Sequence, residues 1–121
     1  MVILLVVNYE NRAMLQNLLR GLPGKVVAVT SLRGAERKFD ALSEVDVIVL
    51  QPCIASSTPN TAEFITDIKR KGFSGKIVVV SDNIGQRGTL IRAGCTQACS
   101  PCNLFCTVLD ATLGPTATVI R

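Results

Sequence analysis

The stretch Val45-Asp-Val-Ile-Val-Leu50 is almost entirely apolar and rich in β-branched residues. Val2-Ile-Leu-Leu-Val-Val7 and Ile77-Val-Val-Val80 have the same character. Short apolar runs of this kind predict strands that are covered on both faces. The segments between them carry apolar residues three and four positions apart, which is the helical period. Strands that alternate with helices predict an α/β fold with a parallel sheet.

Two further strand candidates, Val26–Val29 and Cys95–Cys99, are shorter or more polar than the first three. Such strands are typical of sheet edges. Placing them at the edges gives the strand order 2-1-3-4-5 of flavodoxin-like folds. We therefore expect a three-layer α/β/α domain with a five-stranded parallel sheet over residues 1–114. Residues 115–121 are expected to form a C-terminal tail.

Length and composition exclude several classes of protein. A chain of 121 residues is one ordinary domain, and 48% hydrophobic residues with 18% charged residues exclude a disordered chain. The longest apolar run, Met1–Val7, is far below the roughly 20 residues that span a bilayer, so we expect no membrane contact and a cytoplasmic location. With 4% aromatic residues and scattered basic residues, we expect no direct nucleic-acid binding. The lack of histidine excludes an imidazole base.

Local signals predict where helices begin. Ser31 is a candidate N-cap, and Asn60 and Glu63 have the spacing of a capping box. Ser100 followed by Pro101 predicts the start of the last helix, because proline suits the first helical turn.

The candidate site follows from the predicted sheet. In open parallel sheets, ligands bind beyond the carboxyl ends of the strands, near the reversal of strand order. The residues that follow the strands there include Asn8, Tyr9, Glu10, Gln51, Ser81, Asp82 and Ser100. We therefore expect these side chains to surround one pocket.

Four blocks of sequence carry a resemblance to a known family: Leu4-Leu-Val-Val-Asn-Tyr-Glu10, Asp46-Val-Ile-Val-Leu-Gln51, Ile77-Val-Val-Val-Ser81, and Ala93-Gly-Cys95 with Ser100-Pro101. In order and spacing, the chain resembles the receiver domain of two-component response regulators, from Met1 to about Leu113. The resemblance implies a receiver-like domain in signal transduction, with residues 115–121 leading to an output domain.

The chain departs from the family's charged residues. In receiver domains an acidic pair holds Mg²⁺, and the resemblance places Asn8 and Tyr9 at those two positions. Gln51 stands at the position of the family's phospho-accepting aspartate, and Ser100 stands at the position of its lysine. The family's Thr/Ser position is retained as Ser81. An amide has no anionic oxygen to attack phosphorus, and Mg²⁺ prefers carboxylates. We therefore expect a pseudo-receiver with a degenerate phosphorylation pocket, no cofactor and no enzymatic activity.

Glu10 and Asp82 are the carboxylates left near this pocket, but neither replaces the missing geometry. The simpler interpretation of the amides is that Asn8 and Gln51 hydrogen-bond each other and nearby backbone. On the same view the ring of Tyr9 covers the pocket, and Ser81 is an ordinary hydroxyl at the end of a strand. Ser100 is then a helix cap.

The resemblance also implies that the face formed by helix four, strand five and helix five makes the protein contacts. On this chain that face holds Arg87, Arg92, Cys95 and Cys102, together with two glycines, Gly85 and Gly88. Each glycine weakens helix four by about 1 kcal/mol relative to Ala, which suits a segment that reorders on binding. The expected partner is another protein or an output domain, with a homodimer as the alternative.

The cysteines support a second hypothesis. Cys95, Cys99, Cys102 and Cys106 have the spacing C-x3-C-x2-C-x3-C, and four thiolates suit zinc or an iron–sulfur cluster. The alternative function is therefore a redox or metal-binding protein. Against it, free cysteine also packs as a small hydrophobe, and these positions fall where the fold needs core residues.

Overall fold

The computed structural model describes residues 1–113, and the expected tail at residues 115–121 lies outside the described residues. Five strands form one sheet in which all neighbours are parallel, in the order β2-β1-β3-β4-β5. The predicted fold class and strand order are confirmed. The strands are β1 (Val2–Val6), β2 (Lys25–Val29), β3 (Val47–Leu50), β4 (Lys76–Val80) and β5 (Gln97–Cys99).

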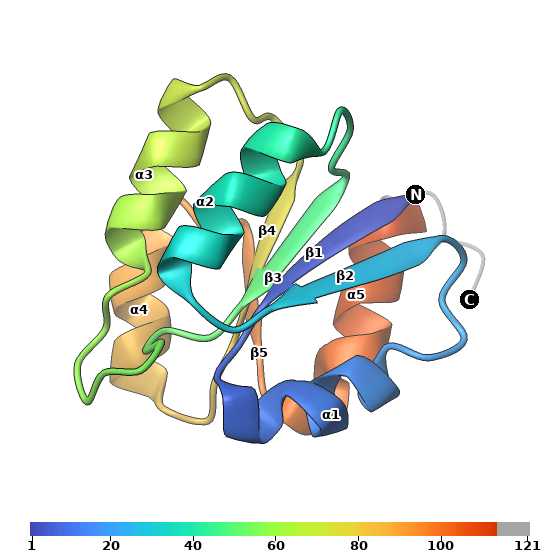
Figure 1. Cartoon of the computed structure of the whole chain (residues 1–121). Helices are drawn as coiled ribbons and strands as arrows, with labels where there is room; N and C mark the ends of the chain where they lie inside the picture. The colour runs from blue at the N-terminus through green and yellow to red at the C-terminus, as the bar shows by residue number, and fades with distance from the viewer. Residues whose placement is uncertain (114–121) are drawn as a thin grey trace.

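Helices cover both faces of this sheet (Figure 1). The helices α2, α3 and α4 lie on one face, and α1 and α5 lie on the other. A short 3-10 helix, Pro101–Asn103, leads directly into α5. The helices are α1 (Tyr9–Leu18), α2 (Leu32–Ala41), α3 (Ala62–Arg70), α4 (Ile84–Ala93) and α5 (Leu104–Leu113).

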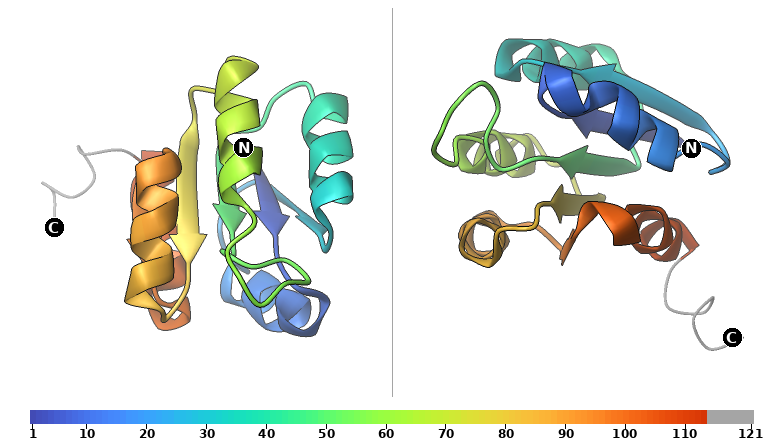
Figure 2. Two further views of the ribbon diagram at one scale, coloured as in Figure 1. Left: turned by 90° about the vertical axis from the view of Figure 1, so that its left-hand side faces the viewer. Right: turned by 90° about the horizontal axis from the view of Figure 1, so that it is seen from below.

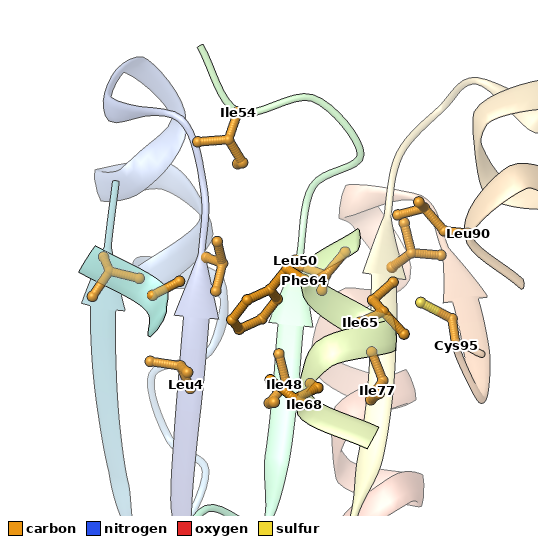
Figure 3. Packing of buried hydrophobic residues seen from close by; sticks show 14 residues of the cluster. Leu4, Ile48, Leu50, Ile54, Phe64, Ile65, Ile68, Ile77, Leu90 and Cys95 are labelled. Atoms are coloured by element: carbon orange, nitrogen blue, oxygen red, sulfur yellow. The ribbon is translucent and has the colours of Figure 1, made fainter. Parts of the chain in front are cut away.

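Alternation of side chains along the strands builds two hydrophobic cores. In β1, Leu4 and Val6 point toward α2–α4, whereas Ile3 and Leu5 point toward α1 and α5. All four are fully buried or nearly so, as expected for a strand covered on both faces. Figure 3 shows the first of these cores, in which Phe64, Ile65 and Ile68 of α3 pack onto the strands.

Two strands begin later than predicted. The backbone N–H of Asp46 donates to the carbonyl of Val2, and the Asp46 carboxylate accepts a hydrogen bond from the N–H of Val2. The regular pairing of β3 with β1 starts only at Val47. The backbone N–H of Cys95 donates to the carbonyl of Leu90 at 3.1 Å, so Cys95 belongs to the turn that follows α4, and β5 starts only at Gln97. These ends are set by contacts with residues distant in sequence.

The predicted caps have different outcomes. Ser31 caps α2, because its Oγ accepts a hydrogen bond from the Gly34 N–H at 2.9 Å. The capping box at Asn60 is wrong, because α3 begins after Thr61 and the Asn60 side chain is bonded to the backbone of Ile54 instead. Ser100 precedes the 3-10 helix, but its side chain makes no capping bond to the backbone.

Candidate functional site

The carboxyl ends of β1 and β3 meet in a network of neutral amides. The backbone N–H of Asn8 donates to Gln51 Oε1 at 2.7 Å, and Asn8 Nδ2 lies 3.4 Å from the same oxygen. Gln51 Nε2 donates to Asn11 Oδ1, in the first turn of α1, at 3.1 Å. The hydrogen bond expected between Asn8 and Gln51 is therefore present, and both ends of the Gln51 amide are used.

Asn8 also holds the loop that follows β3. Its Nδ2 donates to the carbonyl of Cys53 at 2.6 Å, and its Oδ1 accepts from the N–H of Ala55 at 2.8 Å. Asn8 occupies the N-cap position of α1, yet its side chain makes no capping bond to that helix. The side chain is committed to the neighbouring loop instead.

The rest of this loop is anchored in the same way. Asn60 exchanges two hydrogen bonds of 2.8 Å with the backbone of Ile54, and the buried hydroxyl of Thr61 donates to the carbonyls of Gln51 and Pro52. Ile54 is 3% exposed and joins the core beyond the strand ends (Figure 3). The left view of Figure 2 shows the loop crossing the carboxyl ends of the strands. It is held by side chains on two sides.

The other predicted pocket residues stand apart from the amide network. Ser81 Oγ accepts from the Asn83 N–H at 3.0 Å, and the Ser81 carbonyl accepts from Arg87 Nε. Glu10 and Asp82 are exposed, and in the described chain neither hydrogen-bonds to Asn8 or Gln51. Of the predicted pocket residues, Asn8 and Gln51 interact directly, and the hydrogen bonds of the described chain do not join Ser81 to either of them.

Two further expectations about this end of the sheet need correction. The ring of Tyr9 does not cover the pocket, because Tyr9 starts α1 and remains 77% exposed. Asn11, Asn60 and Thr61 were not among the predicted site residues, although they complete the network around the loop. A polar residue three positions after Asn8, on the first turn of the helix, is the signal that could have identified Asn11.

The four clustered cysteines are divided between different environments. Cys95 packs in the core beside α2–α4, Cys99 packs in the core beside α1 and α5, and Cys102 and Cys106 are exposed. Within residues 1–113, no group of three or more cysteine or acidic side chains is placed to hold a metal ion. In this arrangement the four thiols do not converge on one point.

Burial controls the ionisation of the two core cysteines. It raises the pKa of the Cys95 thiol to about 12, although the nearby Lys69 ammonium opposes the shift. Burial also raises the pKa of Cys99, against a hydrogen bond with Thr107 and the charge of Arg87. Both thiols are therefore protonated and shielded, which is the behaviour of core residues.

The exposed side of α4 combines apolar and basic residues. Ile84 is 79% exposed and Ile91 is 42% exposed, and the two lie seven positions apart on the same side of the helix. Arg92 is also exposed, whereas Arg87 is half-buried through its bond to Ser81. The helix contains no acidic residue. Of the predicted contact residues, Cys95 is buried and cannot contribute directly to such a surface.

One surface hollow lies away from the amide network. It has a volume of about 580 Å³ and lies between the end of α1 and β2, lined among others by Gln16, Arg20 and Gly24. Within residues 1–113, its lining residues do not hydrogen-bond to the Gln51 side chain. None of the helices within the described residues has the length and apolar character needed to cross a membrane.

Comparison with known proteins gives structural matches only. No protein-family profile matches the sequence, and no curated protein matches it either. A response regulator receiver protein from Pseudoalteromonas atlantica superposes with a TM-score of 0.76 at 17% identity, covering 93% of this chain and 98% of that one. Chemotaxis protein CheY4 from Vibrio cholerae gives a TM-score of 0.73 at 18% identity, with coverage of 92% and 98%.

A third match is the signal receiver domain of an HD domain-containing protein from Pseudomonas fluorescens Pf-5. Its TM-score is 0.74 at 16% identity, and the match covers 98% of this chain and 92% of that one. Agreement over nearly the whole length, with the same strand order, defines the architecture. This chain has the fold of response-regulator receiver domains.

Proposed function

We propose that this protein is a signalling module of the receiver fold that acts through protein contacts and takes no part in phosphotransfer. The observation that carries the proposal is the engagement of Gln51. The resemblance to receiver domains places the phospho-acceptor position at Gln51. The side-chain oxygen of Gln51 accepts a hydrogen bond from the Asn8 N–H, and its side-chain nitrogen donates one to Asn11 Oδ1. A neutral amide whose oxygen and nitrogen are both hydrogen-bonded offers no nucleophile for phosphoryl transfer.

The surroundings of Gln51 support the same conclusion. A magnesium ion needs carboxylate or phosphate oxygens, and the side chains that hydrogen-bond to the Gln51 amide are themselves amides. The loop after β3 is tied down by Asn8, Asn60 and Thr61. We infer that it holds one conformation without an added phosphate, and that the protein signals by being present or bound rather than by being modified.

Helix α4 is the contact surface that we propose for the partner. Ile84 and Ile91 expose apolar side chains, Arg92 adds positive charge, and Gly85 and Gly88 lower the stability of the helix. A partner protein with apolar and acidic residues would complement this surface. We propose that the chain has no enzymatic activity and binds no cofactor.

The central test is incubation of the purified protein with acetyl phosphate and Mg²⁺, followed by intact-mass spectrometry. We expect the mass of the protein to stay unchanged. A receiver domain that has its aspartate, treated in the same mixture, should gain one phosphoryl group and serves as the control. A covalent phosphate on this chain would overturn the proposal.

The contact surface has a separate test. The double variant Ile84→Asp/Ile91→Asp should lose the proteins that the wild type captures from a cell extract. Met14→Asp, which alters an exposed apolar residue of α1, should retain them. Equal capture by both variants would mean that α4 is not the contact surface.

A further inference from the structure

Within residues 1–113, the pairing of the sheet leaves the outer edge of β2 unused. The N–H of Lys25 donates to the carbonyl of Met1, and the carbonyl of Val29 accepts from the N–H of Val7, so Lys25 and Val29 turn their backbone groups toward β1. Successive residues of a strand turn these groups to opposite sides, and an edge strand presents one unpaired row. The residues between, Val26 and Ala28, therefore turn their N–H and C=O groups away from the sheet (Figure 1).

This edge carries few of the features that usually protect an exposed strand. Edge strands are commonly very short, or are interrupted by proline, by a bulge or by charged side chains. β2 pairs with β1 over five consecutive residues without a bulge, and its single charged residue, Lys25, stands at its start. By contrast β5, at the other edge, has three residues and is closely followed by Pro101. The edge of β2 is therefore open to a further strand.

A hollow lies beside the same edge. Its volume is about 580 Å³, and Gly24 and Val26 line it together with Gln16 of α1 and with Arg20, which follows that helix. Val26 and Ala28 pack their half-buried side chains on this side of the sheet. A strand added next to β2 would place every second side chain on the same side. The hollow is thus positioned to receive a side chain of such a strand.

The charge beside β2 indicates which side chains fit. Arg20 is the charged residue among those that line the hollow, and both Arg20 and Lys25 are exposed. In the part of the chain that the structure describes, neither takes part in a salt bridge. The acidic residue of α1, Glu10, lies in its first turn, at the opposite end of the helix. Carboxylates complement this edge, whereas a second copy pairing through its own β2 would add the same two basic side chains.

We propose that the outer edge of β2 binds an extended acidic segment of a partner protein as a sixth strand. The N–H and C=O groups of Val26 and Ala28 hydrogen-bond to the backbone of the segment, and a carboxylate in the hollow meets Arg20. In recognition of this kind, backbone bonds provide affinity and side-chain pockets provide specificity. The inference does not depend on the α4 surface, because α4 packs on β4 and β5, at the other end of the sheet.

The experiment uses a short synthetic peptide with capped ends, in which glutamate alternates with valine, and measures hydrogen exchange by NMR. In the free protein the N–H groups of Val26 and Ala28 should exchange fast, whereas that of Val27, which faces β1, should exchange slowly. We expect the peptide to slow exchange at Val26 and Ala28 by about tenfold or more. Exchange that the peptide leaves unchanged would overturn the proposal. Slow exchange in the free protein would overturn it too, because another part of the chain or a second copy would then cover the edge.

A variant of the edge tests the backbone bonds. Val26→Pro keeps the approximate size of the side chain and removes an N–H that faces away from β1, which an edge strand tolerates. We expect it to weaken binding of the fluorescently labelled peptide, measured by anisotropy, by about tenfold. Circular dichroism checks its fold. Binding at wild-type strength by the folded variant would contradict the proposal, and if the variant does not fold, hydrogen exchange in the wild type decides.

Charge reversal tests the hollow. Arg20→Glu should weaken binding by about tenfold, whereas Arg92→Glu, the same change of charge on exposed α4, should bind like the wild type. A peptide with lysine in place of glutamate should bind more weakly than the original, and this difference should shrink as salt is added. Equal binding by Arg20→Glu and Arg92→Glu, or of the two peptides, would overturn the proposal. None of these outcomes would alter the acetyl phosphate result or the capture test on α4.

Discussion

The backbone N–H of Asn8 donates a 2.7 Å hydrogen bond to the side-chain oxygen of Gln51, a residue 43 positions later in the chain. This bond joins the residues that follow β1 and β3, two neighbouring inner strands whose ends form the candidate site. Because the Asn8 side chain continues to the loop after β3, one pair of amides links the sheet, α1 and that loop.

Gln51→Met keeps the approximate size of the side chain but removes its hydrogen-bonding groups. The Asn8 N–H and Asn11 Oδ1 then lose their partners in a partly buried place, so we expect the free energy of unfolding to fall by about 1–3 kcal/mol. Urea denaturation measures the change. Gln16→Met, in a half-buried part of α1 outside the network, should stay within about 0.5 kcal/mol of wild type. Equal effects of the two variants would show that the network adds no stability.

Asn8→Ala should loosen the loop after β3 at a defined point. The Ala55 N–H loses its acceptor, so we expect faster hydrogen exchange at that amide, measured by NMR. Asn60→Ala removes the acceptor of the Ile54 N–H and should accelerate exchange at Ile54 instead. Exchange that is unchanged at both amides would mean that the side chains do not hold the loop.

Ala55→Gly should stabilise the protein, although glycine usually destabilises. Ala55 is the non-glycine residue with positive φ in the described chain, at +53°, and this left-handed conformation costs a residue with a Cβ about 1–2 kcal/mol. We expect the free energy of unfolding to rise by up to about 1 kcal/mol, after the entropy cost of glycine is included. Ala13→Gly, in exposed regular helix, should lower it by about 1 kcal/mol. A loss of stability from Ala55→Gly would contradict this reasoning.

Gly85→Ala and Gly88→Ala should each stabilise α4. A Cβ at either position meets its nearest neighbour at 3.4 Å or more, so there is room for it, and alanine favours a helix over glycine by about 1 kcal/mol. Thermal unfolding should show a higher midpoint for each variant. Gly94→Ala provides the contrast, because φ is +126° there and a Cβ would meet Lys69 at 2.6 Å. If Gly85→Ala or Gly88→Ala lowered the midpoint, these glycines would have a packing role that the structure does not show.

Stability should fall at alkaline pH because of Cys95. Burial raises its pKa in the folded protein from 9.0 to about 12, so between these values the unfolded chain releases a proton that the folded chain retains. The stabilising contribution is complete below pH 9 and decreases by up to about 1.4 kcal/mol per pH unit above it. Guanidinium denaturation under reducing conditions at several pH values measures this slope.

The Cys95→Ala variant supplies the control for that slope. It should unfold more easily at neutral pH, because of the small cavity, but its stability should decline less steeply with pH. Burial also raises the pKa of Cys99, so part of the loss of stability with rising pH remains in both proteins. Parallel pH profiles for the variant and the wild type would show that Cys95 does not titrate in this way.

The strands and the strand order could be predicted from sequence because they depend on local composition. Val2–Val6, Val47–Leu50 and Lys76–Val80 are apolar where helices cover them on both faces, and Gln97–Cys99 is more polar at the edge. The cap at Ser31 is likewise local, since its partner Gly34 is three residues away. Hydrophobic patterns of this length allow few other assignments of helix and strand once the helical and strand periods are recognised.

The tertiary structure alone decided the contacts between side chains that are far apart in the chain. Asn60 has the sequence spacing of a helix cap, but its side-chain amide is hydrogen-bonded to the backbone of Ile54, which is buried beyond the strand ends. Cys95 and Cys102 are close in sequence, yet one is buried beside α3 and α4 and the other is exposed. Spacing along a chain fixes how near residues are in sequence, whereas the face that each one occupies depends on how the sheet and its helices pack together.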